Sequence, residues 1–216
     1  IRIGITGPPG AGKSTLTNSL IKFCLDDNKD VGVIAVDPTS PFTGGAILGD
    51  RVRMNKYAGD HRVFLRSLGN HCNLGGLSSK VQEIGDVIAA SGKDYIFFET
   101  VGVGQAEHDI INVADISIVV LVPESGDEIQ LMKAGLIEIA DIFVINKSDR
   151  EGANRIAATL KNILHIFKKR DIKEPQVFNT IANRDKGIYE LFDGIESFLE
   201  MNIKKGLLNT RRLERY

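Results

Sequence analysis

The chain has no tryptophan and only two cysteines, Cys24 and Cys72, among its 216 residues. Two cysteines cannot build a disulfide framework, so we expect a reducing compartment: the cytoplasm, or the mitochondrial matrix in a eukaryote. No apolar run reaches the roughly 18 residues that a membrane-spanning helix needs, and no signal-peptide pattern opens the chain. We therefore expect neither a membrane partner nor a disulfide-stabilised secreted fold.

The chain also has no excess of charge of one sign. Lys and Arg number 27 and Asp and Glu number 28, and the formal net charge is −1. Nucleic acids and anionic membranes select for clustered positive charge, so we expect neither as a partner. Any anionic ligand must then be held by a local site. Because the first residue is not Met and already lies in an expected strand, we expect further chain ahead of it.

Short β-rich runs alternate with helical patterns along the chain. Most of the runs are apolar throughout, which is typical of parallel strands covered on both faces. This alternation predicts a three-layer α/β fold with a mostly parallel, doubly wound sheet. The expected strands are 1–6, 31–36, 95–100, 116–122, 141–146 and, more weakly, 175–180; the expected helices are 13–25, 78–90, 127–139, 152–167 and 187–201.

The composition shows no break that would mark a second core. With 43% hydrophobic residues the chain can bury one good core, and we expect a single domain over 1–202. Residues 203–216 are rich in Lys and Arg and are interpreted as a solvated tail, or as the start of an arm that packs on a second subunit. The longest stretch without expected structure is 38–61, and so long a loop in a compact domain is usually functional.

A phosphate-binding loop follows the first expected strand. It reads GPPGAGKS, from Gly7 to Ser14, and opens the first expected helix, which is the context that a P-loop requires. Its glycines let backbone N–H groups point inward, and the start of the helix adds partial positive charge. Lys13 would reach the outer phosphates and Ser14 would ligate Mg²⁺. The match predicts that the sheet is that of a P-loop NTPase.

The sequence NKSD, after the fifth expected strand, indicates guanine binding. The Asp149 carboxylate can accept from both the ring N–H and the exocyclic amine of guanine, whereas adenine has an acceptor in place of the ring donor. Leaving a partly buried carboxylate unpaired costs about 1–3 kcal/mol, so ATP would be rejected. Lys147 would lay its stem along the base, and Asn146 would tie the loops together. Alone, the motif can be a solvated turn; after a P-loop we favour guanine.

The third expected strand ends in Glu99, three residues before Gly102. An acid at this strand tip can hold a metal through water, and the glycine N–H can sense the γ-phosphate, as Asp-x-x-Gly does in GTPases. The alternative is a Glu99 that only caps a helix. Val103 stands where many GTPases have the glutamine that orients the attacking water, and Gln105 lies further on. We therefore expect slow unaided hydrolysis.

Two acids flank a segment rich in proline and glycine. Asp37 ends the second expected strand at the same sheet edge as the P-loop, so it can approach the metal or the attacking water. Asp50 lies within 38–61 and can arrive only when that segment folds over the nucleotide. We expect a switch whose closure Mg²⁺ and the γ-phosphate stabilise. The alternative is a surface loop with two solvated acids.

The segment 123–135, PESGDEIQLMKAG, starts at the tip of the fourth expected strand. Its charges can simply be those of an exposed first helical turn; the alternative is a switch that faces a partner. The four histidines share no metal-ligand spacing, with the pair His71 and Cys72 as a weak exception.

Together these motifs resemble the MeaB/MMAA/ArgK family, GTPase chaperones of adenosylcobalamin-dependent methylmalonyl-CoA mutase in the SIMIBI class of P-loop GTPases. The likeness covers about residues 1–150, through GITGPPGAGKST, VDPTSPFTGGAILGDRVRM, FLRSL with NLGGLS, ETVGVGQAE, VPESGDEIQ and VINKSD. The chain departs from the family at His71 and Cys72, where an arginine and a glycine are expected.

The resemblance implies a homodimeric GTPase that gates cofactor loading and protection of the mutase, with 123–135 as a third switch. It implies a Mg²⁺ site at Ser14, Asp37, Asp50 and Glu99, with Lys13 and the same three acids acting in catalysis. The implied nucleotide ligands are Gly7, Pro8, Pro9, Gly10, Ala11, Gly12, Lys13, Ser14, Thr15, Gly102, Asn146, Lys147, Asp149 and Ala182.

Two alternatives stay open from the sequence. One is a nickel-insertion GTPase of the urease or hydrogenase maturation type, which carries metal on Cys and His; the lack of a clustered pair other than His71 and Cys72 argues against it. The other is a kinase or ATPase of a transport system, the sense once given to the name ArgK. The guanine-selective motif argues against that class.

Overall fold

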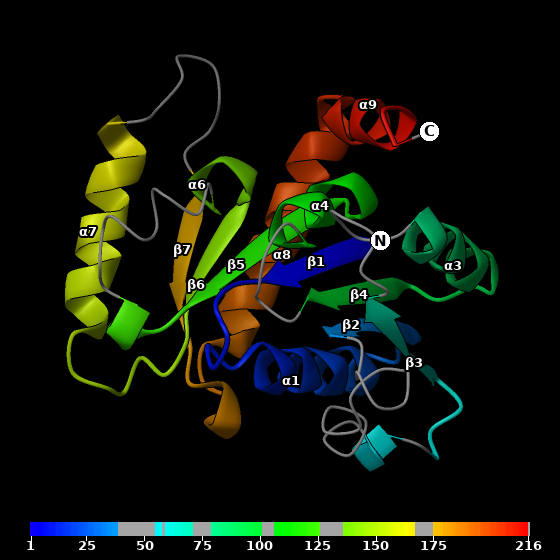
Figure 1. The fold of residues 1–216 in the computed structure, drawn as a ribbon, viewed down its shortest axis with the longest axis horizontal. Coiled ribbons are helices and arrows are strands. Elements are labelled where there is room, and N and C mark those ends of the chain that lie inside the picture. The colour runs from blue at the N-terminus through cyan, green and yellow to red at the C-terminus, as the bar shows by residue number, and fades with distance from the viewer. Residues whose placement is uncertain are drawn as a thin grey trace.

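Seven parallel strands form one sheet in the computed structural model, which describes residues 1–38, 55–57, 59–70, 79–100, 106–125, 136–166 and 175–215 (Figure 1). Their order across the sheet is β3-β2-β4-β1-β5-β6-β7. The strands are β1 (Arg2–Thr6), β2 (Val31–Pro38), β3 (Val63–Asn70), β4 (Tyr95–Thr100), β5 (Ile116–Leu121), β6 (Ile142–Ile145) and β7 (Gln176–Asn179). The α/β fold with a parallel, doubly wound sheet is confirmed.

Helices cover both faces of this sheet. The described helices are α1 (Lys13–Asp26), α3 (Ser79–Ala90), α4 (Ala106–Val113), α6 (Leu136–Ile139), α7 (Ala153–Ile166), α8 (Ile188–Lys204) and α9 (Leu207–Leu213), with short 3-10 helices η1 (Asn55–Tyr57), η2 (Pro123–Ser125) and η3 (Ala182–Arg184). Within the described ranges, no helix is both long enough and apolar enough to cross a bilayer.

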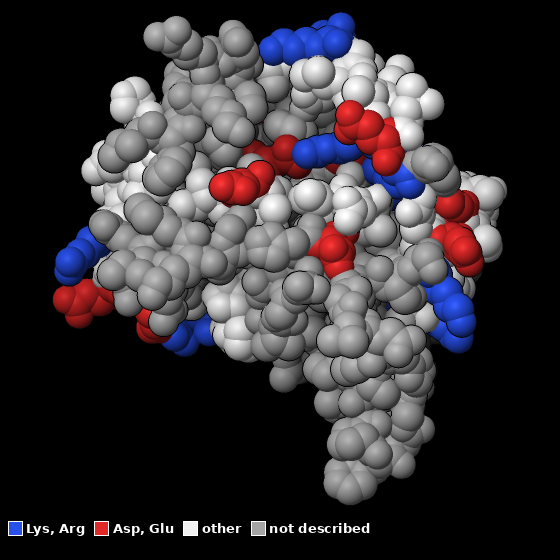
Figure 2. Space-filling view, turned by 45° about the horizontal axis from the view of Figure 1, so that its top comes forward, with Lys and Arg blue, Asp and Glu red and all other residues white. Residues whose placement is uncertain are grey.

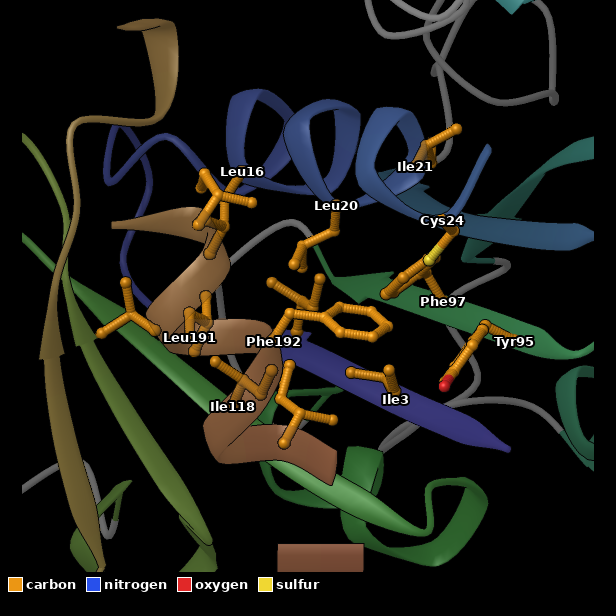
Figure 3. Close-up of a cluster of buried hydrophobic side chains, with 14 of the residues drawn as sticks. Ile3, Leu16, Leu20, Ile21, Cys24, Tyr95, Phe97, Ile118, Leu191 and Phe192 are labelled. Atoms are coloured by element: carbon orange, nitrogen blue, oxygen red, sulfur yellow. The ribbon is translucent and has the colours of Figure 1, made fainter. Parts of the chain in front are cut away.

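The sheet separates two apolar cores. On one face the strands pack against α1 and α8; Figure 3 shows Leu16 and Leu20 of α1 and Phe192 of α8 among the residues of this core. On the other face they pack against α3, α4, α6 and α7. Strands β1, β4, β5 and β6 are buried at every residue, which explains why their sequences are mostly apolar and do not alternate between apolar and polar residues.

One strand and two helices differ from the expectation. Strand β3 (Val63–Asn70) was not expected, because Arg66, Ser67 and Gly69 interrupt its apolar residues. It lies at an end of the strand order, where Phe64 is 45% exposed, so it carries no continuous apolar signal. The short helices α4 and α9 were also not expected. Of the expected helix 127–139, the structure describes the last turn as α6.

The carboxyl ends of the strands meet at one edge of the sheet. The P-loop leaves β1, Glu99 lies in β4 opposite Ile5 of β1, and Asp37 lies near the end of β2. Asn146 follows β6, whose Ile145 pairs with Leu121 of β5. In open parallel α/β sheets ligands bind at this edge, so the topology brings the predicted motifs to one place.

The opposite edge of the sheet carries the C-terminal helix. Asp115, just before β5, is buried and accepts hydrogen bonds from the backbone N–H of Arg2 at 2.9 Å and from the guanidinium groups of Arg212 and Arg215 at 2.9 Å. The side chain of Arg215 is only 4% exposed. The interpretation of these arginines as part of a solvated tail is therefore wrong, because they neutralise a buried carboxylate of the same chain.

Neighbouring contacts extend this ionic cluster across the sheet edge. Arg211 bonds Asp141 through both guanidinium nitrogens at 2.7 and 3.1 Å, and Gln82 of α3 donates to the carbonyl of Arg215 at 2.8 Å. Figure 2 shows acidic and basic side chains adjacent to one another on the face that its view brings forward. The predicted boundary between 1–202 and 203–216 falls within α8, and the division itself stays a prediction.

Candidate nucleotide-binding site

The loop between β1 and α1 has the backbone of a phosphate cradle. Gly7, Gly10 and Gly12 have φ angles of 134°, 78° and 89°, a region that residues with a side chain rarely adopt. Gly12 precedes the first residue of α1, Lys13, and the first turn of this 14-residue helix carries no acid. The helix therefore presents its N-terminal N–H groups and partial positive charge at the loop, with no acidic residue in its own first turn.

Two of these glycines are also fixed by close packing. A Cβ on Gly7 would lie 2.1 Å from the carbonyl oxygen of Val120, and a Cβ on Gly12 would lie 2.4 Å from the Asn146 side-chain nitrogen. Both distances are far below van der Waals contact. The loop is thus seated directly on β5 and on the NKSD motif, with no room for a side chain between them.

Two lysine ammonium groups donate hydrogen bonds to carbonyl oxygens of this loop. The buried Lys13 donates to Gly7 at 2.7 Å and to Pro8 at 3.1 Å. Lys147 donates to Gly10 at 2.8 Å from the other side. Both cations are therefore held beside the concave backbone, where they would meet the charge of a bound phosphate chain.

Ser14, in the first turn of α1, contacts Glu99 of β4. The Ser14 hydroxyl donates to the Glu99 carboxylate, which is 7% exposed, and the hydroxyls of Thr6 and Thr100 hydrogen-bond at 2.9 Å beside them. Glu99 also lies opposite Ala35, two residues before Asp37 in β2. Hydroxyl and carboxylate oxygens are the ligands that Mg²⁺ takes beside phosphates, so these residues fit such an ion.

The structure describes some of the other predicted ligands only in part or not at all. Of Asp37 only the backbone position is described, while Asp50 and Gly102 lie outside the described residues. Within the described ranges, no group of three or more His, Cys, Asp and Glu side chains is placed to hold a metal ion. Thr15 occupies the first turn of α1 and is exposed.

Asn146 joins the P-loop to the loop that follows β7. Its amide nitrogen donates to the Ala11 carbonyl at 3.0 Å. Its oxygen accepts from the Thr180 hydroxyl at 3.2 Å and from the Ala182 N–H at 3.1 Å. With 3% of its surface exposed, this amide has its donor and its acceptor committed to fixed backbone positions. The phosphate loop and the loop after β7 are therefore locked to each other through one side chain.

Asp149 lies at the surface of the same turn. Lys147 adopts a left-handed conformation with φ 55°, and the Ser148 N–H donates to the Thr180 carbonyl at 3.0 Å. These contacts turn the chain so that the Asp149 side chain is 37% exposed, 3.9 Å from the guanidinium of Arg184. The carboxylate is thus open to a base approaching along the loop.

Sequence reasoning missed two arginines around this turn. Arg184, in the loop after β7, lies beside Asp149. Arg150 donates to Glu124 of η2, and this hydrogen bond lowers the pKa of Glu124 below its ordinary value. The Arg150 contact links the first turn of 123–135 to the NKSD turn. The only sequence signal for the contact between Arg150 and Glu124 was that their segments follow β5 and β6, which are successive expected strands.

The whole chain matches a known family. Residues 1–216 match the family model described as methylmalonyl Co-A mutase-associated GTPase MeaB. The chain belongs to the MeaB family. The resemblance drawn from the motifs is therefore confirmed, and so is the expected enzyme class, because this is a family of GTPases.

Two relatives and a solved structure are similar to the chain over nearly its whole length. A protein of Pyrococcus abyssi is 50% identical over 216 residues, which are 99% of this chain and 67% of that protein. A fused isobutyryl-CoA mutase of Geobacillus kaustophilus is 37% identical over 225 residues, covering 99% of this chain and 21% of that protein. The crystal structure of a LAO/AO transport system kinase superposes with a TM-score of 0.79 at 29% identity, covering all of this chain and 64% of that one.

The chain thus spans about two thirds of the archaeal relative and of the solved structure, and about one fifth of the fused mutase. In the last case, a segment similar to this whole MeaB-family chain occurs in the same polypeptide as an acyl-CoA mutase.

Proposed function

We propose that the chain is a Mg²⁺-dependent enzyme that binds GTP and hydrolyses it to GDP and phosphate. The observation that carries the proposal is the Asn146 side chain, which bonds Ala11 of the P-loop and Ala182 of the loop after β7. A phosphate cradle and a base-reading turn are thereby held at one sheet edge. That arrangement suits a nucleoside triphosphate laid across it.

The P-loop residues act on the phosphates. The Lys13 ammonium exchanges its bonds to the Gly7 and Pro8 carbonyls for phosphate oxygens, and the N–H groups at the start of α1 bind the phosphate chain. Ser14 and Glu99 would hold Mg²⁺ together with Asp37 and Asp50, and the ion, when bound, would neutralise charge on the phosphates. The acids also orient the attacking water, with Asp37 two residues beyond Ala35, the residue that lies opposite Glu99 in the sheet.

Base selectivity comes from the NKSD turn. Asp149 accepts the two N–H groups of guanine, and the stem of Lys147, whose ammonium group is held at the Gly10 carbonyl, lies along the base. Ala182, whose N–H is already bonded to Asn146, lines the site from the next loop. With Val103 where many GTPases have a glutamine, turnover without a partner is slow.

We further propose that this GTPase serves an adenosylcobalamin-dependent acyl-CoA mutase such as methylmalonyl-CoA mutase. Two findings support the client: the description of the family and the fused relative named as an isobutyryl-CoA mutase. GTP would favour one conformation of a homodimeric chaperone, and hydrolysis would release it, so that cofactor loading and protection of the mutase are gated. A nucleotide can do this only by binding the two conformations unequally.

The client is tested by the effect of a mutase on GTP turnover. We expect an adenosylcobalamin-dependent methylmalonyl-CoA mutase from the same source to accelerate turnover at least roughly tenfold, because partner contacts that complete a GTPase site act at this scale or above. Lys133→Ala, in the segment 126–135 that lies outside the described residues, is expected to keep basal turnover and lose the acceleration. Lys161→Ala, an exposed lysine on α7, is the matched control and keeps both.

If the mutase does not accelerate turnover while basal GTP turnover is intact, the proposal that the mutase is the client is contradicted, and the proposal of GTP hydrolysis stands. The transport-kinase alternative retains one observation, the name of the similar solved structure. Transfer of labelled γ-phosphate to a protein substrate would support that alternative instead.

A further inference from the structure

We propose that Ser19, on α1, is a positioning residue for the loop between β7 and α8. This loop, residues 180–187, is called the base loop below, because with the NKSD turn it would contact the guanine base. Ser19 follows Ser14 by five residues on the same helix, and its hydroxyl donates to the Ala182 carbonyl in the base loop at 2.8 Å. The inference rests on the proposed function, because it assumes that the NKSD turn and the loop after β7 bind guanine.

The peptide groups of Ala182 are held from two sides. Its N–H donates to the Asn146 side chain at 3.1 Å. Its carbonyl accepts from Ser19 at 2.8 Å and, within η3, from the Asp185 N–H at 3.3 Å. Ser19 is 7% exposed and Ala182 is 3% exposed, so water cannot readily replace the bonds that Ala182 makes with Asn146 and Ser19. The Ser19 bond is the shorter of the two at this buried carbonyl, and losing a hydrogen bond to a buried acceptor costs more free energy than losing one to an exposed acceptor. Ser19 therefore contributes directly to where Ala182 lies.

The rest of the loop moves with Ala182. Ile181 and Lys186 form an antiparallel bridge, with N–H to carbonyl distances of 3.0 and 3.3 Å in the two directions. One helical turn beyond Ser19, Lys22 pairs with Asp185 at 2.6 Å and lowers the pKa of that carboxyl. Both partners of this ion pair are about half exposed, so it guides the loop but adds little free energy. The buried Ser19 hydroxyl is the main attachment.

Helix α1 gives this attachment a function. It begins with Lys13 and Ser14 at the phosphates, and Ser19 lies five residues further along the same helix. The adjoining face of α1 is packed into the core through Leu16 and Leu20 (Figure 3). A nucleotide fixes the spacing between its phosphates and its base, so a helix that contacts both sites sets the spacing of the two loops to match. We infer that Ser19 keeps the base loop in register with the P-loop.

Ser19 has two competing interactions. One is a hydrogen bond to the Asp185 carboxylate of the same loop, which contributes to lowering the pKa of that carboxyl after the larger effect of Lys22. The Ser19 hydroxyl also lies 3.3 Å from the Thr15 carbonyl, one turn back in α1, a contact that serines in helices make without any further role. The shorter distance to Ala182 favours the loop as the acceptor. If Thr15 took the proton instead, removing the hydroxyl would leave the base loop unchanged, which separates the two cases experimentally.

The test compares guanine nucleotide with a ligand that has no base. In Ser19→Ala we expect the dissociation constant of GDP to rise about 5- to 10-fold, the effect of one lost buried hydrogen bond. The affinity for inorganic tripolyphosphate, which needs only the P-loop, should stay within about twofold. Alanine suits a helix interior better than serine, so the variant is expected to fold, and thermal unfolding verifies this.

Thr17→Val is the matched control. Thr17 is also buried in α1, and its hydroxyl donates to the Lys13 carbonyl at 3.0 Å, within the helix and away from the base loop. Its replacement removes a hydroxyl from the same helix and should leave the affinities for both ligands near those of the unaltered chain.

Each other outcome has a definite meaning. If the unaltered chain does not prefer GDP over ADP, the proposed function fails, and the inference falls with it. If the unaltered chain prefers GDP but Ser19→Ala binds GDP as before, the inference fails and the function stands. If Ser19→Ala weakens GDP and tripolyphosphate equally, the hydroxyl supports α1 rather than the base loop, and the inference is overturned.

Discussion

Asp149→Asn is expected to change the preferred base from guanine to xanthine. Guanine presents two N–H donors to the carboxylate, and an asparagine accepts only one of them while its NH₂ group faces the other. Xanthine has a carbonyl where guanine has the amine, so it can accept from that NH₂ group. We expect GDP affinity to fall roughly 100-fold or more, because two charge-assisted hydrogen bonds are affected, and XDP affinity to rise above that for GDP. Isothermal titration with GDP, XDP and ADP measures the change.

The control for Asp149→Asn is Glu151→Gln. Glu151 is exposed two residues further along the same turn, so its exchange removes the same charge near the site without touching the base. It should bind all three nucleotides as the unaltered chain does. An Asp149→Asn variant that still prefers GDP to XDP would show that this carboxylate does not read the base.

Asp115→Asn is expected to destabilise the fold by about 3–5 kcal/mol, the usual loss when one partner of a buried ion pair is removed. Asp115 is 1% exposed and receives hydrogen bonds from Arg212 at 3.0 and 2.9 Å and from Arg215 at 2.9 Å. Without the carboxylate, the guanidinium of Arg215 is left buried beside a neutral amide. Urea denaturation at neutral pH measures the loss. Asp193→Asn, which alters an exposed acid on α8, should leave the midpoint unchanged.

The same carboxylate makes the fold sensitive to acid. Burial alone would raise the pKa of Asp115, but the hydrogen bonds from Arg212, the Arg2 backbone and Arg215 hold that pKa well below its usual range. A depressed folded-state pKa gives stability that is fully present above the unfolded value of about 3.9 and is lost as the pH falls below it. Between about pH 4 and pH 2, the free energy of unfolding should therefore fall less steeply in Asp115→Asn. An identical slope in both proteins would contradict the assignment.

The sheet and the main motifs could be predicted because they leave local signals. Buried central strands are mostly apolar, and the P-loop and NKSD motifs occupy the chain directly after β1 and β6. The tie that Asn146 makes between loops also followed from its motif. Strand β3 could not be recognised in the same way. It lies at an end of the strand order, where part of the strand is exposed, so its sequence contains polar residues among the apolar ones.

Contacts between distant residues left no such signal. The Ser19 bond to Ala182 spans 163 positions, and the bonds from Arg212 and Arg215 to Asp115 span about a hundred. A basic C-terminal segment has the composition of a solvated tail, and only the fold shows that a buried carboxylate faces it. Arg184 was likewise unremarkable in sequence until β7 and β6 brought it beside Asp149.

Hydrolysis of GTP and of ATP by the unaltered chain, measured side by side with and without Mg²⁺, tests the central claim most directly. The account predicts slow GTP hydrolysis that requires Mg²⁺, with no measurable ATP hydrolysis under the same conditions. Equal use of ATP, or GTP hydrolysis that persists when Mg²⁺ is removed by a chelator, would contradict it.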